Sequence, residues 1–201
     1  MNRISLEKKG DYPNFIGSWF IEPTSLCDEI IDFFESNQEK QSVGTLANGT
    51  RNDNVKKTTD ITIYPSDTKL ETYNSINKYI ENLYDCYVDY LAIWPFLKDI
   101  LPSVDIGAFN IQRYYKGEHF QEVHTERTSM NTLHRTLAWM TYLNDVEDGG
   151  STSFHHYDLD VKPEKGKTLI WPADWTHAHS GKVVNSGVKY IITGWMHFTE
   201  T

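Results

Sequence analysis

The sequence predicts an α+β fold in which N-terminal helices pack on one face of a β core. Two observations lead to this prediction. In residues 1–104, apolar residues recur at the three- and four-residue steps of amphipathic helices. In residues 105–201, short apolar or alternating runs are separated by turn-forming residues, which is typical of strands in a sandwich or barrel. Helices followed by strands is the element order of α+β proteins.

Length and composition indicate one globular domain. The chain has 201 residues, of which 39% are apolar and 23% charged, and a chain of this size can bury a hydrophobic core. No internal repeat, low-complexity tract or Pro/Gly/Ser-rich linker divides it. We therefore expect a single domain over residues 1–201, with residues 1–104 as mainly helical support and residues 105–201 as the β core.

Charge and cysteine content disfavour several classes of protein. The net charge of −9 argues against nucleic-acid or anionic-membrane partners, because both need a basic face. The sequence has no apolar run long enough for a transmembrane helix, and residues 1–12 lack the apolar core of a signal peptide. Both cysteines, Cys27 and Cys86, fall in predicted helices, so a disulfide framework is not expected. We expect a cytoplasmic protein, and the sequence leaves its oligomeric state open.

Two helices are expected in the first half of the chain. Pro23-Thr24-Ser25 is a helix-start signal, and apolar residues at helical spacing follow it over residues 26–39. A longer helix is expected over residues 67–91, where the apolar residues form one stripe suited to packing against a sheet. Short strands are expected at residues 19–21 and 60–64.

The second half contains five strand-like runs, separated by turn-rich pieces such as residues 144–150. These runs are residues 108–115, 137–143, 151–154, 168–171 and 189–197. Strands at this spacing are expected to build the β core.

His124-Thr125-Glu126 is the first candidate for metal binding. Residues i and i+2 of a strand point to the same face, so this segment would present an imidazole and a carboxylate together. Two histidines and one carboxylate on one face of a metal leave three positions open, as in non-haem Fe(II) oxygenases. Two further imidazoles follow downstream, in His177 and His179.

The residues after His179 predict a β-hairpin. A turn at residues 185–187 separates a strand that follows His179 from a return strand, so we expect His179 and Lys189 on neighbouring strands of one sheet. Lysine is rarely buried without a partner. A small dicarboxylate could supply that partner, and an exposed lysine on the outer face is the alternative. Alternation along the strand places four residues on one face: Lys189, Ile191, Thr193 and Trp195.

Five ordered blocks between residues 109 and 197 resemble one known family. The blocks are Tyr114-Tyr115-Lys116-Gly117 with Phe120 and His124-Thr125-Glu126, residues 135–145, residues 149–154, residues 163–171, and His179 with Lys189 ten residues later. In this order and spacing they resemble the prolyl 4-hydroxylase-like branch of the Fe(II)/2-oxoglutarate-dependent oxygenase superfamily.

The resemblance implies a double-stranded β-helix, or jelly roll, as the β core. It implies Fe(II), with O2 and 2-oxoglutarate as co-substrates and ascorbate as a further candidate. The metal ligands would be His124, Glu126 and His179. The residues expected to bind 2-oxoglutarate are Lys189, which would pair with the far carboxylate, and Tyr114, Thr152 and Trp195.

The chain departs from the family pattern at two places. The family usually has aspartate where this chain has Glu126. The stretch between Gly117 and His124 is one residue longer than usual, which leaves Tyr114 and Tyr115 as alternatives for the co-substrate contact. The Tyr-x-x-Gly spacing favours Tyr114.

The remaining histidines receive other expected roles. The ten-residue spacing to Lys189 favours His179 over His177 as the metal ligand, so His177 is expected to be exposed or to support the ligands. The others are expected to be structural or to face the substrate: His119, His134, His155 and His156.

The implied activity is 2-oxoglutarate-dependent hydroxylation with release of succinate and CO2. A prolyl residue in a protein or peptide is the leading substrate. The alternatives are a hydroxylase of a free amino acid or other small molecule, and a cupin-like metal-binding module without 2-oxoglutarate turnover. Residues 43–58, expected to form a mobile loop, and residues 127–134 are expected to shape the substrate entrance.

Overall fold

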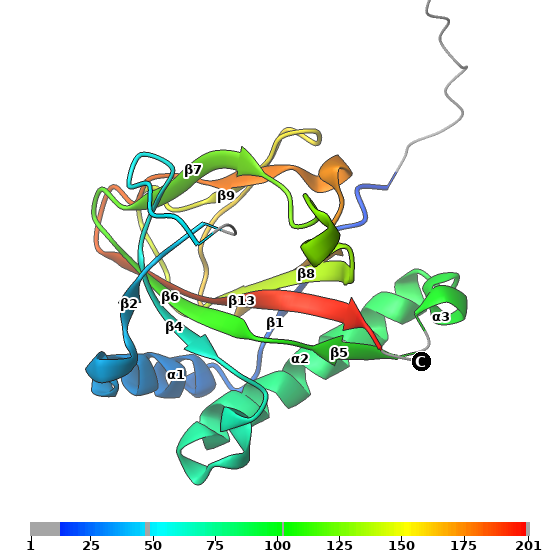
Figure 1. Cartoon of the computed structure of the whole chain (residues 1–201), viewed down its shortest axis with the longest axis horizontal. Coiled ribbons are helices and arrows are strands. Elements are labelled where there is room, and N and C mark those ends of the chain that lie inside the picture. Colours follow the sequence, from blue (N-terminus) through cyan, green and yellow to red (C-terminus); the bar gives the residue numbers. More distant parts are fainter. Residues whose placement is uncertain (1–12, 47–48, 102, 200–201) are drawn as a thin grey trace, which may run out of the picture.

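Two antiparallel sheets face each other in the computed structural model, which describes residues 13–46, 49–101 and 103–199 (Figure 1). The larger sheet of this described part consists, in spatial order, of β1 (Gly17–Phe20), β11 (Lys167–Pro172), β8 (Arg135–Tyr142), β13 (Val188–Phe198), β6 (Phe109–Tyr115), β4 (Thr59–Ile63) and β2 (Ser42–Val43), with β5 (Val104–Ile106) paired to β13. The smaller sheet consists of β10 (Leu159–Val161), β9 (Thr152–Phe154), β12 (His179–Gly181), β7 (His119–His124) and β3 (Lys56–Lys57). This arrangement confirms the predicted jelly-roll core.

Helices cover the outer face of the larger sheet, as predicted (Figure 1). They are α1 (Ser25–Ser36), α2 (Asn74–Ile93) and the short α3 (Leu97–Ile100). Each of the first two buries an apolar stripe, which in α2 includes Ile76, Tyr79 and Leu83. These side chains form one core cluster with sheet residues such as Trp139 and Ile192. Burial of that stripe is what fixes the helices on this face.

The second helix begins later than the sequence indicated. Two 3-10 turns, Asp67–Lys69 and Glu71–Tyr73, precede α2. Leu70, which the apolar stripe included, has an extended backbone and is 59% exposed. Because Leu70 is not buried in the core, its side chain does not hold residues 67–70 in a regular helix.

A second core lies between the two sheets. It includes Tyr114, Met140, Phe154 and Ile191. Alternation along β13 divides that strand between the two cores: Lys189 and Ile191 are buried toward the smaller sheet, whereas Ile192 packs with the helices. The predicted division of faces along residues 189–195 is therefore correct.

The N-terminal half contributes to both sheets as well as to the helices. β1 pairs with β11, β4 pairs with β6, and β3 adds to the edge of the smaller sheet at β7. The described part of residues 1–104 thus contains strands as well as helices. The division into a support and a core within one domain stays a prediction. So does the mobile loop over residues 43–58, of which residues 47 and 48 lie outside the described residues.

The predicted hairpin between His179 and Lys189 is wrong. β12 lies in the smaller sheet between β7 and β9, whereas β13 lies in the larger sheet between β8 and β6. The intervening residues cross from one sheet to the other at a corner, where the Gly117 N–H donates to the Val184 carbonyl at 2.8 Å. A turn signal shows that the chain changes direction, but it does not specify which sheet the next strand joins. His179 and Lys189 consequently approach the interior from opposite sheets.

Within the described part of the chain, no helix has the length and apolarity needed to cross a membrane.

Candidate metal and co-substrate site

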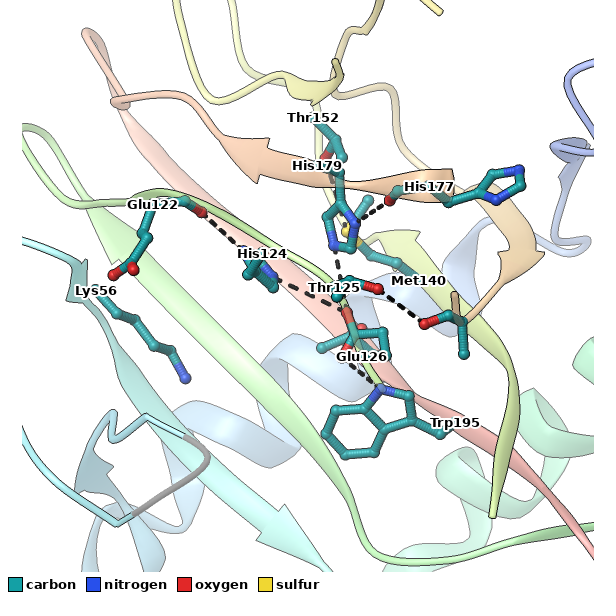
Figure 2. A network of polar contacts seen from close by, with 12 residues as sticks. Lys56, Glu122, His124, Thr125, Glu126, Met140, Thr152, His177, His179 and Trp195 are labelled. Carbon is teal, nitrogen blue, oxygen red and sulfur yellow. Dashed lines mark hydrogen bonds and ion pairs between the residues drawn. The ribbon is translucent and has the colours of Figure 1, made fainter. Parts of the chain in front are cut away.

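His124, Glu126 and His179 come together at neighbouring strands of the smaller sheet (Figure 2). His124 is the last residue of β7, and His179, the first residue of β12, lies opposite it in the antiparallel register. The strand expected through His124-Thr125-Glu126 ends at His124, so Glu126 follows the strand. The hydroxyl of Thr125 donates to the Ala173 carbonyl at 3.0 Å and ties this segment to the residues that precede His179.

The donor atoms of these three side chains are close enough to share one metal ion. Glu126 Oε1 lies 3.3 Å from His179 Nε2 and 3.9 Å from His124 Nε2. All three donor atoms lie within 4.8 Å of one another, and residues 13–46, 49–101 and 103–199 contain no other such group of histidine, cysteine or carboxylate side chains. Two imidazoles and one carboxylate fit an Fe(II) ion bound on one face.

Backbone carbonyls orient both imidazoles toward this centre. His124 Nδ1 lies 2.8 Å from the Glu122 carbonyl, and His179 Nδ1 lies 2.9 Å from the His177 carbonyl. A carbonyl only accepts, so each Nδ1 carries a proton, and Nε2 is the atom through which each ring can bind a metal. The His177 ring points away from the centre, toward the Asn14 carbonyl at 2.8 Å (Figure 2). The structure thus brings His179, and not the ring of His177, to the other two residues.

The surroundings favour the protonation states that metal binding needs. Burial, reinforced by nearby His179, lowers the pKa of His124 to about 4. Burial alone would raise the pKa of Glu126, but hydrogen bonding and charge from His179, with contributions from His124 and Trp195, lower it to about 2. At neutral pH His124 is therefore neutral and Glu126 ionised, as a metal ligand must be.

Lys189 is a buried cation that points into the space between the sheets. Its side chain is 2% exposed, its Nζ donates to the Gly150 carbonyl at 3.1 Å, and it lies 4.3 Å from the centre of the Tyr114 ring. Among the described residues no carboxylate pairs with it, and burial lowers its pKa to about 8. A desolvated ammonium without a counter-charge fits the carboxylate of a small ligand.

The metal-ligand group and Lys189 border the same interior. The centre of the His179 ring lies 5.7 Å from the centre of the Phe154 ring and 5.2 Å from that of the Trp171 ring. Both aromatic residues belong to the core between the sheets, which also contains Tyr114 beside Lys189. A ligand held by Lys189 would therefore lie in the interior that the metal-ligand group borders.

Comparisons with known proteins agree with this geometry. Residues 109–197 match the model of the 2OG-Fe(II) oxygenase superfamily. This stretch is less than half of the chain, and over it the protein is similar to that superfamily. It is 30% identical to a probable prolyl 4-hydroxylase 9 of Arabidopsis thaliana over 48% of this chain and 43% of the relative. It is 29% identical to prolyl 4-hydroxylase subunit alpha-1 of Homo sapiens over 34% of this chain and 14% of the relative. The chain thus spans less than half the length of either relative.

Solved structures show the same fold at low sequence identity. A prolyl hydroxylase of Trichoplax adhaerens, in complex with a hypoxia inducible factor oxygen degradation domain peptide fragment, superposes with a TM-score of 0.73 at 15% identity, over 92% of this chain and 84% of that one. A viral collagen prolyl hydroxylase from Paramecium Bursaria Chlorella virus-1, in complex with 2OG, superposes with a TM-score of 0.63 at 17% identity, over 92% and 97%. These likenesses establish the fold alone.

The other residues expected to bind a co-substrate are placed as follows. Tyr114 is buried beside Lys189, whereas Tyr115 is 46% exposed, so the structure favours Tyr114 of the two. Thr152 is buried on β9, and its hydroxyl accepts a hydrogen bond from Tyr142 at 2.7 Å. Trp195 donates its indole N–H to Glu126 Oε2 at 2.7 Å. Contacts of Tyr114, Thr152 and Trp195 with 2-oxoglutarate stay predictions.

Sequence reasoning missed a buried polar chain behind Tyr114. The Tyr114 hydroxyl donates to Gln112 Oε1 at 2.7 Å, and Gln112 Nε2 donates to Asp60 Oδ2 at 3.0 Å. Asp60 also pairs with Lys56 at 2.8 Å, and both side chains are more than nine-tenths buried. Only Gln112 had a sequence signal, because it lies two residues before Tyr114 and shares its strand face. Lys56 and Asp60 lie in the N-terminal half, where no motif pointed to the site.

The remaining histidines of the described chain lie outside the metal-ligand group. His119 is buried, and His134 is exposed and lies 4.4 Å from His197, ring centre to ring centre. His155 Nε2 lies 3.0 Å from the Ser180 hydroxyl, and His156 lies 6.1 Å from the Trp175 ring. Structural or substrate-facing roles for these residues stay predictions.

Proposed function

We propose that this chain is an Fe(II)- and 2-oxoglutarate-dependent dioxygenase that hydroxylates a prolyl residue in a protein or peptide, releasing succinate and CO2. One observation carries the proposal. The interior holds a metal-ligand group of two histidines and one carboxylate together with Lys189, a buried cation that lacks a carboxylate partner in the described chain. A metal-binding module that does not use 2-oxoglutarate has no need of this cation, since burying it costs free energy.

The residues of the chain divide the work between them. When bound, Fe(II) and 2-oxoglutarate supply the oxidising chemistry that inserts one oxygen atom into the substrate and one into succinate. His124, Glu126 and His179 would hold the metal ion, since two histidines and one carboxylate are the ligands of non-haem Fe(II) oxygenases. Lys189 binds and orients the far carboxylate of 2-oxoglutarate by a charge-assisted hydrogen bond. Apolar side chains of the core between the sheets exclude water from this end of the site.

A peptide is favoured over a free amino acid by the surface beside the ligands. Met130 and Trp175 are 82% and 69% exposed, and they lie on the segments that follow Glu126 and precede His179. Arg127 and Asp174 join these two segments by an ion pair at 3.1 Å. Large exposed apolar side chains at the rim of a site are suited to contacts with a chain longer than one residue. The prolyl hydroxylase relatives support a prolyl target.

Turnover with defined substrates tests this proposal. The purified chain is incubated with Fe(II), ascorbate, 2-oxoglutarate and O2, with proline-containing peptides in one arm and free proline in the other. We expect succinate formation coupled to a +16 Da product in the peptide arm. A +16 Da product confined to free proline would replace the peptide substrate by a small molecule. Absence of both succinate formation and 2-oxoglutarate binding would overturn the proposal.

We also propose a cytoplasmic, reducing location. Cys27 and Cys86 support it, since both are buried free thiols. Cell fractionation with an antibody to the protein tests this location, and recovery of the protein in a secreted fraction would contradict it.

A further inference from the structure

The two oxygens of Glu126 have different partners. Oε1 faces the imidazoles, at 3.3 Å from His179 Nε2 and 3.9 Å from His124 Nε2. Oε2 points the other way and accepts the indole N–H of Trp195 at 2.7 Å (Figure 2). A distance of 2.7 Å is at the short end for an N–H donor, as expected when the acceptor is charged. The carboxylate therefore presents one oxygen to the metal-ligand group and has the other engaged.

Arg135 holds the Trp195 ring from the adjacent strand. Its guanidinium carbon lies 3.6 Å from the centre of the indole, a close cation–π contact. Arg135 Nη1 also donates to the Glu126 backbone carbonyl at 3.2 Å and lies 3.8 Å from Oε2. Because β8 and β13 are paired strands, the sheet backbone fixes both side chains relative to each other. Glu126 is thus contacted through its carboxylate and through its backbone.

A glutamate ligand needs this support more than an aspartate does. Its side chain has one more rotatable bond, and ordering that bond costs conformational entropy. A mobile carboxylate can also offer either oxygen, or both, to a metal. A donor that occupies Oε2 removes this freedom before the metal arrives.

We propose that Trp195 is a positioning residue that holds Glu126 as a one-oxygen metal ligand through Oε1, with Arg135 holding the indole in place. This inference rests on the proposed function, since it assumes that a metal binds His124, Glu126 and His179. The contact with Trp195 would explain why this position holds a glutamate, Glu126, and not an aspartate. An aspartate at this position ends one C–C bond, about 1.5 Å, further back and cannot reach both the metal and the indole.

A double-mutant cycle measures this role without turnover. Mn(II) binding is followed anaerobically by calorimetry for the wild type, Trp195→Phe, Glu126→Asp and the double variant. Loss of a supporting contact to a metal ligand costs about tenfold or more in affinity, so Trp195→Phe is expected to weaken Mn(II) binding by about tenfold. In the Glu126→Asp background the same substitution is expected to change affinity by less than about twofold, because the shorter side chain makes no bond to the indole.

Two further variants separate positioning from general packing. Trp139→Phe removes a buried indole N–H that has no hydrogen-bond partner among the described residues and lies on the helix side of the same sheet. It is expected to leave Mn(II) affinity unchanged. Arg135→Gln removes the stacked cation but keeps the indole, and it is expected to weaken Mn(II) binding a few-fold. Thermal unfolding of each variant shows whether it is folded.

The wild-type indole provides a measurement that needs no tryptophan variant. In 15N-labelled protein the Trp195 indole N–H is expected to exchange slowly with solvent, and faster in Glu126→Asp. Equal exchange in both would overturn the inference. So would a loss of Mn(II) affinity from Trp195→Phe that is the same in both backgrounds, or no loss at all. A wild type that binds no Mn(II) would overturn the proposed function itself, which distinguishes the two failures.

Discussion

Replacing Lys189 by methionine is expected to weaken 2-oxoglutarate binding and to stabilise the ligand-free protein at the same time. Methionine has a similar volume but no charge. Truncating one partner of a buried charge pair costs about 2–5 kcal/mol. A middle value of about 3–4 kcal/mol corresponds to a loss of affinity for 2-oxoglutarate of roughly 100- to 1,000-fold.

The expected gain in stability follows from the pKa of Lys189. Burial lowers it from the ordinary 10.5 to about 8, so at pH 7 the folded protein carries an ammonium group that the fold disfavours by about 3 kcal/mol. Removing that group also removes its hydrogen bond to the Gly150 carbonyl, which offsets about 1 kcal/mol. The free energy of unfolding of Lys189→Met should therefore rise by about 1–2 kcal/mol without ligand.

Calorimetry with Mn(II) and 2-oxoglutarate under anaerobic conditions measures the affinity, and urea unfolding at pH 7 measures the stability. Lys182→Met is the matched control, because Lys182 is half exposed and pairs with Asp160 at the surface. That variant should keep its 2-oxoglutarate affinity within about twofold. Unchanged affinity in Lys189→Met would place the anchor elsewhere. A loss of stability would show that the cation is satisfied in the ligand-free fold.

The remaining predictions concern turnover, pH and backbone geometry. Alanine substitution of His124, Glu126 or His179 should abolish succinate formation, whereas His177→Ala should retain most of it. Substantial turnover in any variant of the metal-ligand group would contradict the ligand assignment. The affinity for 2-oxoglutarate should fall by up to about tenfold per pH unit above pH 8, because Lys189 of the ligand-free protein there loses the proton that binds the carboxylate. Lys189→Arg should lack this dependence. Identical calorimetric pH profiles for the two proteins would exclude Lys189 as the source of the pH dependence. Gly150→Ala should weaken 2-oxoglutarate binding several-fold and lower the unfolding temperature. Gly150 has a φ of +68°, and an added Cβ would lie 3.2 Å from Lys189 Cδ. An unchanged calorimetric affinity would show that the site accommodates the methyl group without moving Lys189.

Local pattern predicted the two main helices and several strands, and the family resemblance predicted the candidate site. Strand alternation over residues 189–195 correctly separated the faces of β13, because side-chain direction in a strand follows directly from sequence parity. The spacing of His124, Glu126, His179 and Lys189 reproduced a known order of ligands and anchor, and the structure brings the first three together. The N-terminal boundary of α2 was not predictable, since the apolar stripe continued through Leu70, which the fold leaves exposed.

Tertiary structure alone decided how these parts face each other. The sequence determined that His179 and Lys189 lie on strands separated by a turn, but only the sheet topology places them on opposite walls of one interior. The tertiary structure also brings the Trp195 indole into a hydrogen bond with Glu126. It connects the Lys56–Asp60 ion pair to Tyr114 through hydrogen bonds of Gln112. The physical reason is the range of the interactions. Periodicity reports which face of an element is buried, whereas contacts between elements depend on the packing of strands distant in sequence, which no local pattern encodes.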